Sequence, residues 1–240
     1  MEPPEIRHQS PPWRVVAALL ILAAVLIPTD GSLSLAIRTA DIPGELNRVL
    51  NRAETFGHGA GVVMIALTLV ICLRPHYRTG LCAAAAAIGA GMTANIIKTM
   101  VARTRPSDLV DLASSTSPAP VFLKYSNTSA YLSHLVTKAE QSFPSAHTAT
   151  AFGLATALAA MFPRGRHWFT LLAVLVGMQR IVNGAHYVSD VLTGAAVGLV
   201  VGRLVVGRFA AADARRDQAL SETVISHPAL QPSSETSQAA

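Results

Sequence analysis

Charged residues are scarce in this chain, at 14% of its 240 residues, whereas soluble globular proteins carry about 25%. Cysteine is scarcer still, because Cys72 and Cys82 are too few for a disulfide framework and lack the spacing of metal ligands. Aromatic residues reach only 5% and the basic residues form no stripe, so the net charge of +5 does not indicate a nucleic-acid partner. The remaining 51% of hydrophobic residues favours a membrane protein.

Six apolar runs of about 17–23 residues are each long enough to cross the hydrocarbon core of a bilayer as a helix. They cover about 13–29, 57–73, 79–101, 145–162, 167–184 and 187–209. The third run is rich in Ala and Gly, which suits close helix packing. The sequence therefore predicts an all-α fold: a six-span transmembrane helical bundle with a long extracytoplasmic loop between the third and fourth helices.

These runs divide the chain into four parts. We expect a cytoplasmic N-terminus, a first transmembrane helix with an outer interfacial segment, a membrane core, and a disordered cytoplasmic tail without apolar periodicity. Their ranges are 1–12, 13–56, 57–209 and 210–240. Inside the core, 107–143 forms an outer insertion without a spanning segment. Insertions of this length are often functional lids, and we hypothesise that this one gates substrate entry.

Arginine-rich short loops predict the orientation of the bundle, because such loops face the cytoplasm. Two turns and the end of the last run carry these residues: Arg74, Arg78, Arg164, Arg166, Arg203, Arg208, Arg215 and Arg216. Both termini are then cytoplasmic, and we expect a bacterial inner membrane. No small-x-small site soon follows Leu26, so an uncleaved first span is preferred over a cleaved signal peptide. Residues 41–52 are consistent with a short helix on the outer membrane surface.

Three short polar stretches interrupt the apolar runs: Lys98–Pro106, Pro144–His147 and Arg180–Asp190. Charge at bilayer depth costs about 2.5–3.5 kcal/mol per residue, so it usually marks a functional site. Because the helices alternate in direction, all three stretches fall on the outer, periplasmic face. Segments that are distant in sequence and converge on one face are expected of an active site.

Two histidines in these stretches are candidates for acid–base and nucleophilic chemistry. His186 and Asp190 are four residues apart and share a helix face, so the carboxylate can orient the imidazole and leave its second nitrogen as a nucleophile. His147 can protonate a leaving oxygen. For either motif taken alone, an ordinary polar helix start or helix cap is the competing interpretation.

The cations and the helix start suit a bound phosphate. Lys98 and Arg105 are two helical turns apart and can face the same side if the helix persists, and Arg180 adds a third positive charge. Ser145 supplies a hydroxyl at a helix N-terminus, where backbone N–H groups attract anions, and the small Ala146 permits close approach. Snorkelling at the interface explains any one of these cations but not their shared face.

The pattern Lys98-x6-Arg105-Pro106, Pro144-Ser145-Ala146-His147 and Arg180-x5-His186-x3-Asp190 resembles the three-part signature of the type 2 phosphatidic acid phosphatase (PAP2) superfamily. The likeness extends over about 57–209. The resemblance implies that His186 attacks phosphorus and forms a phosphohistidine, that Asp190 orients it, and that His147 is the acid. It also implies that no metal or other cofactor is needed. The implied phosphate-binding residues are Lys98, Arg105, Ser145, Ala146 and Arg180.

Two positions depart from the family pattern. Family members typically have Gly where Ala146 stands and Ser where Gln179 stands. The methyl group of Ala146 leaves the backbone donor intact, whereas Gln179 puts one phosphate contact and the substrate preference in question. Arg103 lies off the helix face of Lys98 and is not assigned to the site.

The expected function is that of an integral membrane lipid phosphatase acting on a phosphomonoester or pyrophosphate in the outer leaflet. Phosphatidic acid, undecaprenyl pyrophosphate, phosphatidylglycerol phosphate and lipid A phosphate are all compatible substrates. A vanadate haloperoxidase-like enzyme is an alternative, although those relatives are soluble. A non-catalytic six-span binder or carrier of lipid phosphates is a second alternative, disfavoured because binding needs no paired nucleophile and acid.

Overall fold

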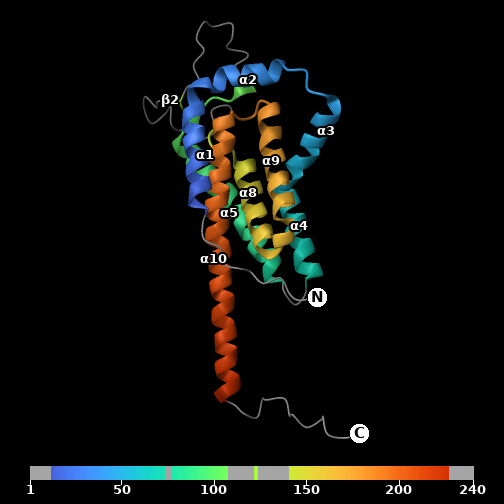
Figure 1. Ribbon diagram of the computed structural model, residues 1–240, viewed down its shortest axis with the longest axis vertical. Helices are drawn as coiled ribbons and strands as arrows, with labels where there is room; N and C mark the ends of the chain where they lie inside the picture. Colours follow the sequence, from blue (N-terminus) through green and yellow to red (C-terminus); the bar gives the residue numbers. More distant parts are fainter. Residues whose placement is uncertain (1–11, 74–76, 108–121, 124–140, 227–240) are drawn as a thin grey trace.

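The computed structural model describes residues 12–73, 77–107, 122–123 and 141–226. Most of these residues belong to helices gathered in one bundle (Figure 1). The helices are α1 (Trp13–Leu26), α2 (Asp30–Thr39), α3 (Gly44–Ala53), α4 (Gly59–Cys72), α5 (Arg78–Met100), α8 (Ala146–Met161), α9 (Arg166–Val182) and α10 (Val188–Ser226). The short elements are the 3-10 turns η1 (Ile27–Thr29), η2 (Glu54–Gly57) and η4 (Pro163–Gly165), and the antiparallel strands β1 (Ala102–Arg103) and β2 (Phe122–Leu123).

Helix α8 is the centre of the bundle and packs against α5, α9 and α10. Small residues make this close approach possible. A Cβ atom added at Gly153 of α8 would lie 2.5 Å from the carbonyl oxygen of Ala86 in α5, so the two backbones touch there. Ala83, Ala86, Ala87 and Ala90 of α5 are fully buried. The alanine-rich run predicted to pack closely does so.

The all-α fold agrees with the prediction, but six spans do not follow from the described helices. By length and composition, three helical stretches can cross a membrane: Trp13–Thr39, Arg78–Met100 and Val188–Thr223. The pair Gly44–Gly57 and Gly59–Cys72, bent by 63°, would make a fourth if it is one span. Helix α8 is apolar but has only 16 residues.

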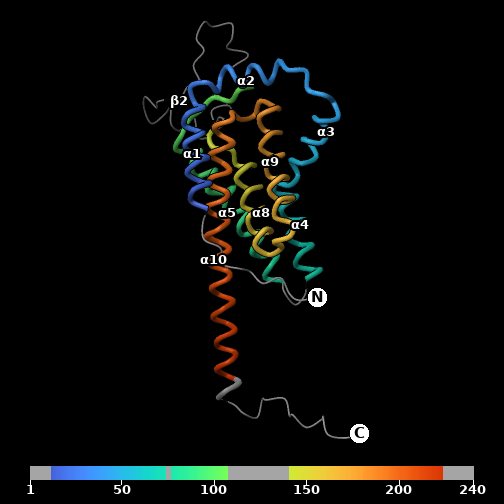
Figure 2. The backbone as a smooth tube through the Cα atoms, viewed as in Figure 1, coloured from blue at the N-terminus to red at the C-terminus, as the bar shows by residue number. Residues whose placement is uncertain are grey.

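The predicted disorder from residue 210 onward is wrong for 210–226. Helix α10 continues without a break to Ser226 and extends well past the rest of the bundle (Figure 2). Residues 210–220 are mostly Ala, Arg, Gln, Asp and Leu, and the abundant Ala, Arg, Gln and Leu are helix formers that need no apolar periodicity. An ion pair from Arg78 Nε to Asp213 Oδ1, at 2.6 Å, also ties this segment to α5. Residues 227–240 lie outside the described part of the chain.

Helix α2 crosses the end of the bundle where α9 ends and α10 begins, and α3 descends beside α9 (Figure 1). The helix expected at about 41–52 is α3, whose Leu46 and Val49 are exposed while Leu50 is buried. Most of the 107–143 insertion, and with it the expected lid, lies outside the described residues. The described parts are Ser107, the two residues of β2, and 141–143.

Candidate active site

The turn between α9 and α10 positions the first candidate residues. Gly184 has a φ of +65°, a left-handed conformation that favours glycine, and its carbonyl oxygen accepts a 2.9 Å hydrogen bond from the backbone of Ser107. The backbone N–H groups of Ala185 and His186 both bond to the carbonyl oxygen of Arg180. The chain therefore reverses tightly, and His186 lies just before the first turn of α10.

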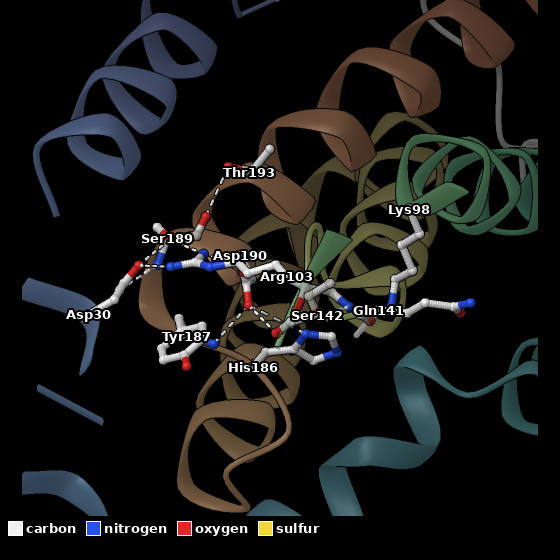
Figure 3. A network of polar contacts seen from close by, with 12 residues as sticks. Asp30, Lys98, Arg103, Gln141, Ser142, His186, Tyr187, Ser189, Asp190 and Thr193 are labelled. Carbon is white, nitrogen blue, oxygen red and sulfur yellow. Dashed lines mark hydrogen bonds and ion pairs between the residues drawn. The ribbon is translucent and has the colours of Figure 1, made fainter. Parts of the chain in front are cut away.

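Asp190 is fully buried and is held by donors from separate parts of the chain (Figure 3). Its Oδ2 accepts a 2.6 Å hydrogen bond from Ser142 Oγ and a 2.9 Å bond from the backbone N–H of Tyr187. Its Oδ1 accepts a hydrogen bond from Arg103. With both oxygens bonded, the carboxylate has a fixed orientation beside His186.

Arg103, which the sequence analysis left outside the site, lies within this buried network. Its Nη1 donates to Asp190 and also to Ser189 Oγ at 2.7 Å, while its Nη2 donates to Asp30 Oδ2 at 2.7 Å. Its guanidinium carbon lies 4.2 Å from the ring centroid of Tyr187. The helical-face argument against Arg103 was wrong because α5 ends at Met100, and Arg103 follows in extended strand β1.

His186 is 2% exposed. Its Nδ1 lies 3.7 Å from Asp190 Oδ2, an ion-pair distance longer than a hydrogen bond. Burial is the main cause that lowers the pKa of His186 from 6.5 to about 4; the charges of Lys98 and Arg105 act in the same direction, and Asp190 partly opposes them. The imidazole is therefore neutral at physiological pH. Its Nδ1 is buried and has no hydrogen-bond partner among the described residues.

The start of α8 brings His147 to the same end of the bundle. Ser145 caps the helix, since its Oγ accepts hydrogen bonds from Thr148 N at 3.4 Å and Thr148 Oγ1 at 2.9 Å. Its backbone N–H donates to the carbonyl oxygen of Asp190 at 3.1 Å, which joins α8 to α10. Ala146 is the first helical residue. The half-buried ring of His147 lies 5.8 Å, centroid to centroid, from that of His58.

The three predicted cations reach the site by different routes. Lys98 is buried at the end of α5 and donates a 3.1 Å hydrogen bond to the carbonyl oxygen of Gln141. Lys98 and Arg105 do not share a helix face, because the helix ends between them, yet both lie near enough to act on the charge of His186. The Nε atoms of Arg105 and Arg180 are buried and have no hydrogen-bond partner among the described residues. Unpaired buried donors of this kind favour an anionic ligand.

Glu54, in the turn η2, is a site neighbour that the sequence analysis missed. Its Oε1 accepts a 2.5 Å hydrogen bond from Arg180 Nη1 and lies 3.8 Å from His147 Nε2. Its Oε2 accepts a 2.8 Å hydrogen bond from the Nε2 atom of Gln179, one of the two residues that depart from the family pattern. Gln179 therefore contacts a carboxylate of the chain itself.

The residues around the site that were not predicted are all polar. Some lie outside the three polar stretches, and the others lie within a stretch but were not assigned a role. These residues are Asp30, Glu54, Arg103, Ser142 and Ser189. One signal was available for Asp30, since a carboxylate directly after an apolar run is costly unless it is paired. Within the described residues, no three His, Cys, Asp or Glu side chains are grouped as a metal site would require.

Comparison with known proteins gives one family and several relatives. The model of the PAP2 superfamily matches residues 79–212, which contain all three motifs. The lipid A 1-phosphatase of Rhizobium johnstonii is 28% identical over 204 residues, or 78% of each chain. The decaprenylphosphoryl-5-phosphoribose phosphatase of Mycobacterium tuberculosis is 30% identical over 168 residues, which are 69% of this chain and 81% of the relative.

A solved structure has a similar fold. The transmembrane PAP2-type phosphatidylglycerolphosphate phosphatase of Bacillus subtilis superposes with a TM-score of 0.57. The superposition covers 83% of this chain and 96% of the other, at 22% sequence identity. At that identity the likeness concerns the arrangement of helices.

Proposed function

Because this chain belongs to the PAP2 superfamily, a family of phosphatases, and is an integral membrane protein, we propose that it hydrolyses a lipid phosphomonoester or pyrophosphate through a phosphohistidine on His186. The observation that carries this proposal is the state of His186. Its imidazole is enclosed and neutral, and it lies beside a fixed carboxylate among cations. A neutral imidazole has the lone pair that an attack on phosphorus requires.

The reaction proceeds in two displacements. His186 Nε2 attacks phosphorus, so that a P–N bond forms while the P–O bond to the lipid breaks. The electron pair leaves on the lipid oxygen, which takes a proton from His147, and this step requires the imidazolium form of His147 in the complex with the anionic substrate. A water molecule then attacks the phosphohistidine, His147 takes back a proton, and the P–N bond breaks to release inorganic phosphate and neutral His186.

The surrounding groups stabilise charge during these steps. Attack turns His186 into a positively charged phosphoimidazolium, and the carboxylate of Asp190, 3.7 Å from Nδ1, stabilises that charge. Lys98, Arg105 and Arg180 hold the phosphate oxygens, together with the N-terminus of α8 at Ser145 and Ala146. This assignment is supported by the buried guanidinium donors that have no partner within the described chain.

Among lipid phosphates, we favour a lipid A phosphate. The support is the lipid A 1-phosphatase relative, which aligns with 78% of this chain. Relatives named for a polyprenyl-linked phosphoribose and for phosphatidylglycerolphosphate make those lipids, with phosphatidic acid and undecaprenyl pyrophosphate, the other members of a test panel. We further propose that the site faces the periplasm from a bacterial inner membrane with both termini in the cytoplasm, as the arginine-rich short loops suggest.

Phosphate release by the purified full-length protein in detergent, with a chelator present, tests this function. We expect release from at least one member of the lipid panel. His186→Ala should abolish it, while His167→Ala, which alters an exposed histidine at the opposite end of α9, should leave it intact. Full activity of His186→Ala would refute the nucleophile assignment, and strict dependence on added metal would refute the metal-free mechanism.

A further inference from the structure

We propose that Glu54 is an exchangeable ligand of Arg180, a carboxylate that holds one oxygen position of the phosphate site until the substrate displaces it. The inference rests on the proposed function, because it assumes that Arg180 binds phosphate. It assigns a role to a residue that lies outside the three motifs and outside the 79–212 range that matches the family.

The position of the Glu54 carboxylate supports this role. Its Oε1 lies 2.5 Å from Arg180 Nη1 and 3.8 Å from His147 Nε2, so one oxygen is placed between a phosphate-binding cation and the proposed acid. A substrate phosphate needs an oxygen in the same place, since it must bind Arg180 and direct its leaving oxygen toward His147. Glu54 and the substrate therefore compete for one position.

Gln179 gives this carboxylate a second anchor. Its amide Nε2 donates to Glu54 Oε2 at 2.8 Å, and it also lies 3.3 Å from Asn51 Oδ1 of α3. Gln179 is 1% exposed, so its side chain is held in place by its surroundings. Gln179 stands where the family typically has serine. Its longer side chain reaches the carboxylate of Glu54 in η2.

The backbone brings Glu54 to the site, while the exposure of its side chain allows it to leave. A Cβ atom added at Gly57 would lie 2.6 Å from the carbonyl oxygen of His147, so η2 packs directly against the start of α8. The side chain of Glu54 is 31% exposed, whereas that of Arg180 is 13% exposed. A rotation of the Glu54 side chain can therefore move its carboxylate into water without moving η2.

Exchange has consequences at both ends of the catalytic cycle. Before substrate arrives, Glu54 neutralises part of the positive charge at Arg180, which weakens the binding of free inorganic phosphate and other small anions. After hydrolysis, the return of the carboxylate to Arg180 favours release of the phosphate product. Without Glu54, phosphate should bind more tightly and inhibit more strongly as a product.

Direct binding of inorganic phosphate to the full-length protein in detergent, measured by titration calorimetry, tests the proposal without requiring turnover. Glu54→Gln removes the charge and keeps the shape, and we expect it to tighten phosphate binding about tenfold, or about 1.4 kcal/mol. Gln179→Ser removes the second anchor without changing net charge and should shift binding in the same direction by less. Glu45→Gln, at an exposed position of α3, is the matched control and should not change it.

The sign of the effect separates the possible outcomes. If Glu54 merely positions Arg180, a folded Glu54→Gln variant would bind phosphate more weakly, and that result would overturn the proposal. If Glu54→Gln does not fold, weaker or equal binding by Gln179→Ser overturns it instead. Equal binding by wild type and Glu54→Gln would overturn the role of Glu54 but leave the phosphatase function standing. If neither the wild type nor any variant binds phosphate, the proposed function itself fails, and the role of Glu54 fails with it.

Discussion

Arg103 and Asp190 form an ion pair in which neither side chain has any exposed surface. Asp30, also fully buried as a side chain, binds the same guanidinium through Nη2 at 2.7 Å. Removing such charges from water is costly, and the cost is offset only when every partner is in place. Arg103 in strand β1 therefore joins the start of α2, at Asp30, to the start of α10, at Asp190, which lies beside His186.

Replacing Arg103 by Met should destabilise the protein and reduce turnover. The substitution keeps much of the side-chain volume but leaves two buried carboxylates without their cation, and loss of one partner of a buried pair typically costs about 3–5 kcal/mol. The thermal unfolding midpoint in detergent and the rate of phosphate release would both fall. Arg48→Met, which alters an exposed pair on α3, is the control. An unchanged midpoint for Arg103→Met would show that the buried network contributes nothing to stability.

Asp30→Asn tests whether the start of α2 supports the site. Asparagine keeps the shape but replaces a charged acceptor of Arg103 and Ser189 with a neutral one, which we expect to cost about 1–3 kcal/mol of stability. Turnover should fall because Asp190 loses part of its orientation through Arg103. Asp41→Asn, at an exposed position, should change neither quantity. Wild-type turnover in Asp30→Asn would mean that the contact of Asp30 with Arg103 is not needed to orient the catalytic groups.

Gly194→Ala should disturb the junction between α10 and α8. An added Cβ would lie 2.5 Å from the carbonyl oxygen of Ser145 and 3.3 Å from Thr148 Cβ, so the helices must separate at the cap of α8. Overpacking of this kind typically costs about 1–3 kcal/mol, and here it would also move His147. The control is Gly89→Ala, whose Cβ would make an ordinary 3.5 Å contact with Val201 Cγ1. Equal unfolding midpoints for the two variants would contradict the close packing of α8 and α10.

The lowered pKa of His186 predicts how stability depends on pH. The unfolded chain binds a proton at His186 near pH 6.5, whereas the folded chain resists protonation until about pH 4. Protonation therefore favours the unfolded state as the pH falls through that range, and stability decreases. His186→Gln lacks this contribution, so the unfolding midpoint of the wild type should fall relative to that of the variant between pH 6.5 and 4. Parallel curves would show that the pKa is not lowered.

Much of the fold was predictable because apolar runs and helix ends are local properties of the sequence. The predicted runs match α4, α5, α8 and α9 to within about two residues at most ends. The extension of α10 past residue 209 was missed because helix propensity, rather than apolar content, maintains the helix there. Six spans stay a prediction. Three helical stretches among the described residues pass by length and composition, or four with the bent pair, and a short apolar helix such as α8 is stabilised by the helices around it as well as by lipid.

The residues proposed for chemistry were also predictable, whereas the residues that hold them were not. His147, Arg180, His186 and Asp190 lie in compact motifs with characteristic spacing. The contacts of Asp190 with Arg103 and Ser142 join positions 87 and 48 residues apart, and no local pattern encodes such pairings. The position of Arg103 depends on the end of α5 at Met100. If the helix continued through Arg103, its side chain would lie on a different side of the chain from the one it takes in strand β1.

Detection of the covalent intermediate tests the proposed mechanism most directly. The wild-type protein would be mixed with a lipid phosphate substrate carrying radiolabelled phosphorus, quenched in alkali, in which phosphohistidine survives, and digested to locate the label. We predict phosphate on His186, and none in His186→Ala. Label on any other residue, or sustained turnover by a wild-type protein that never carries label, would contradict attack by His186.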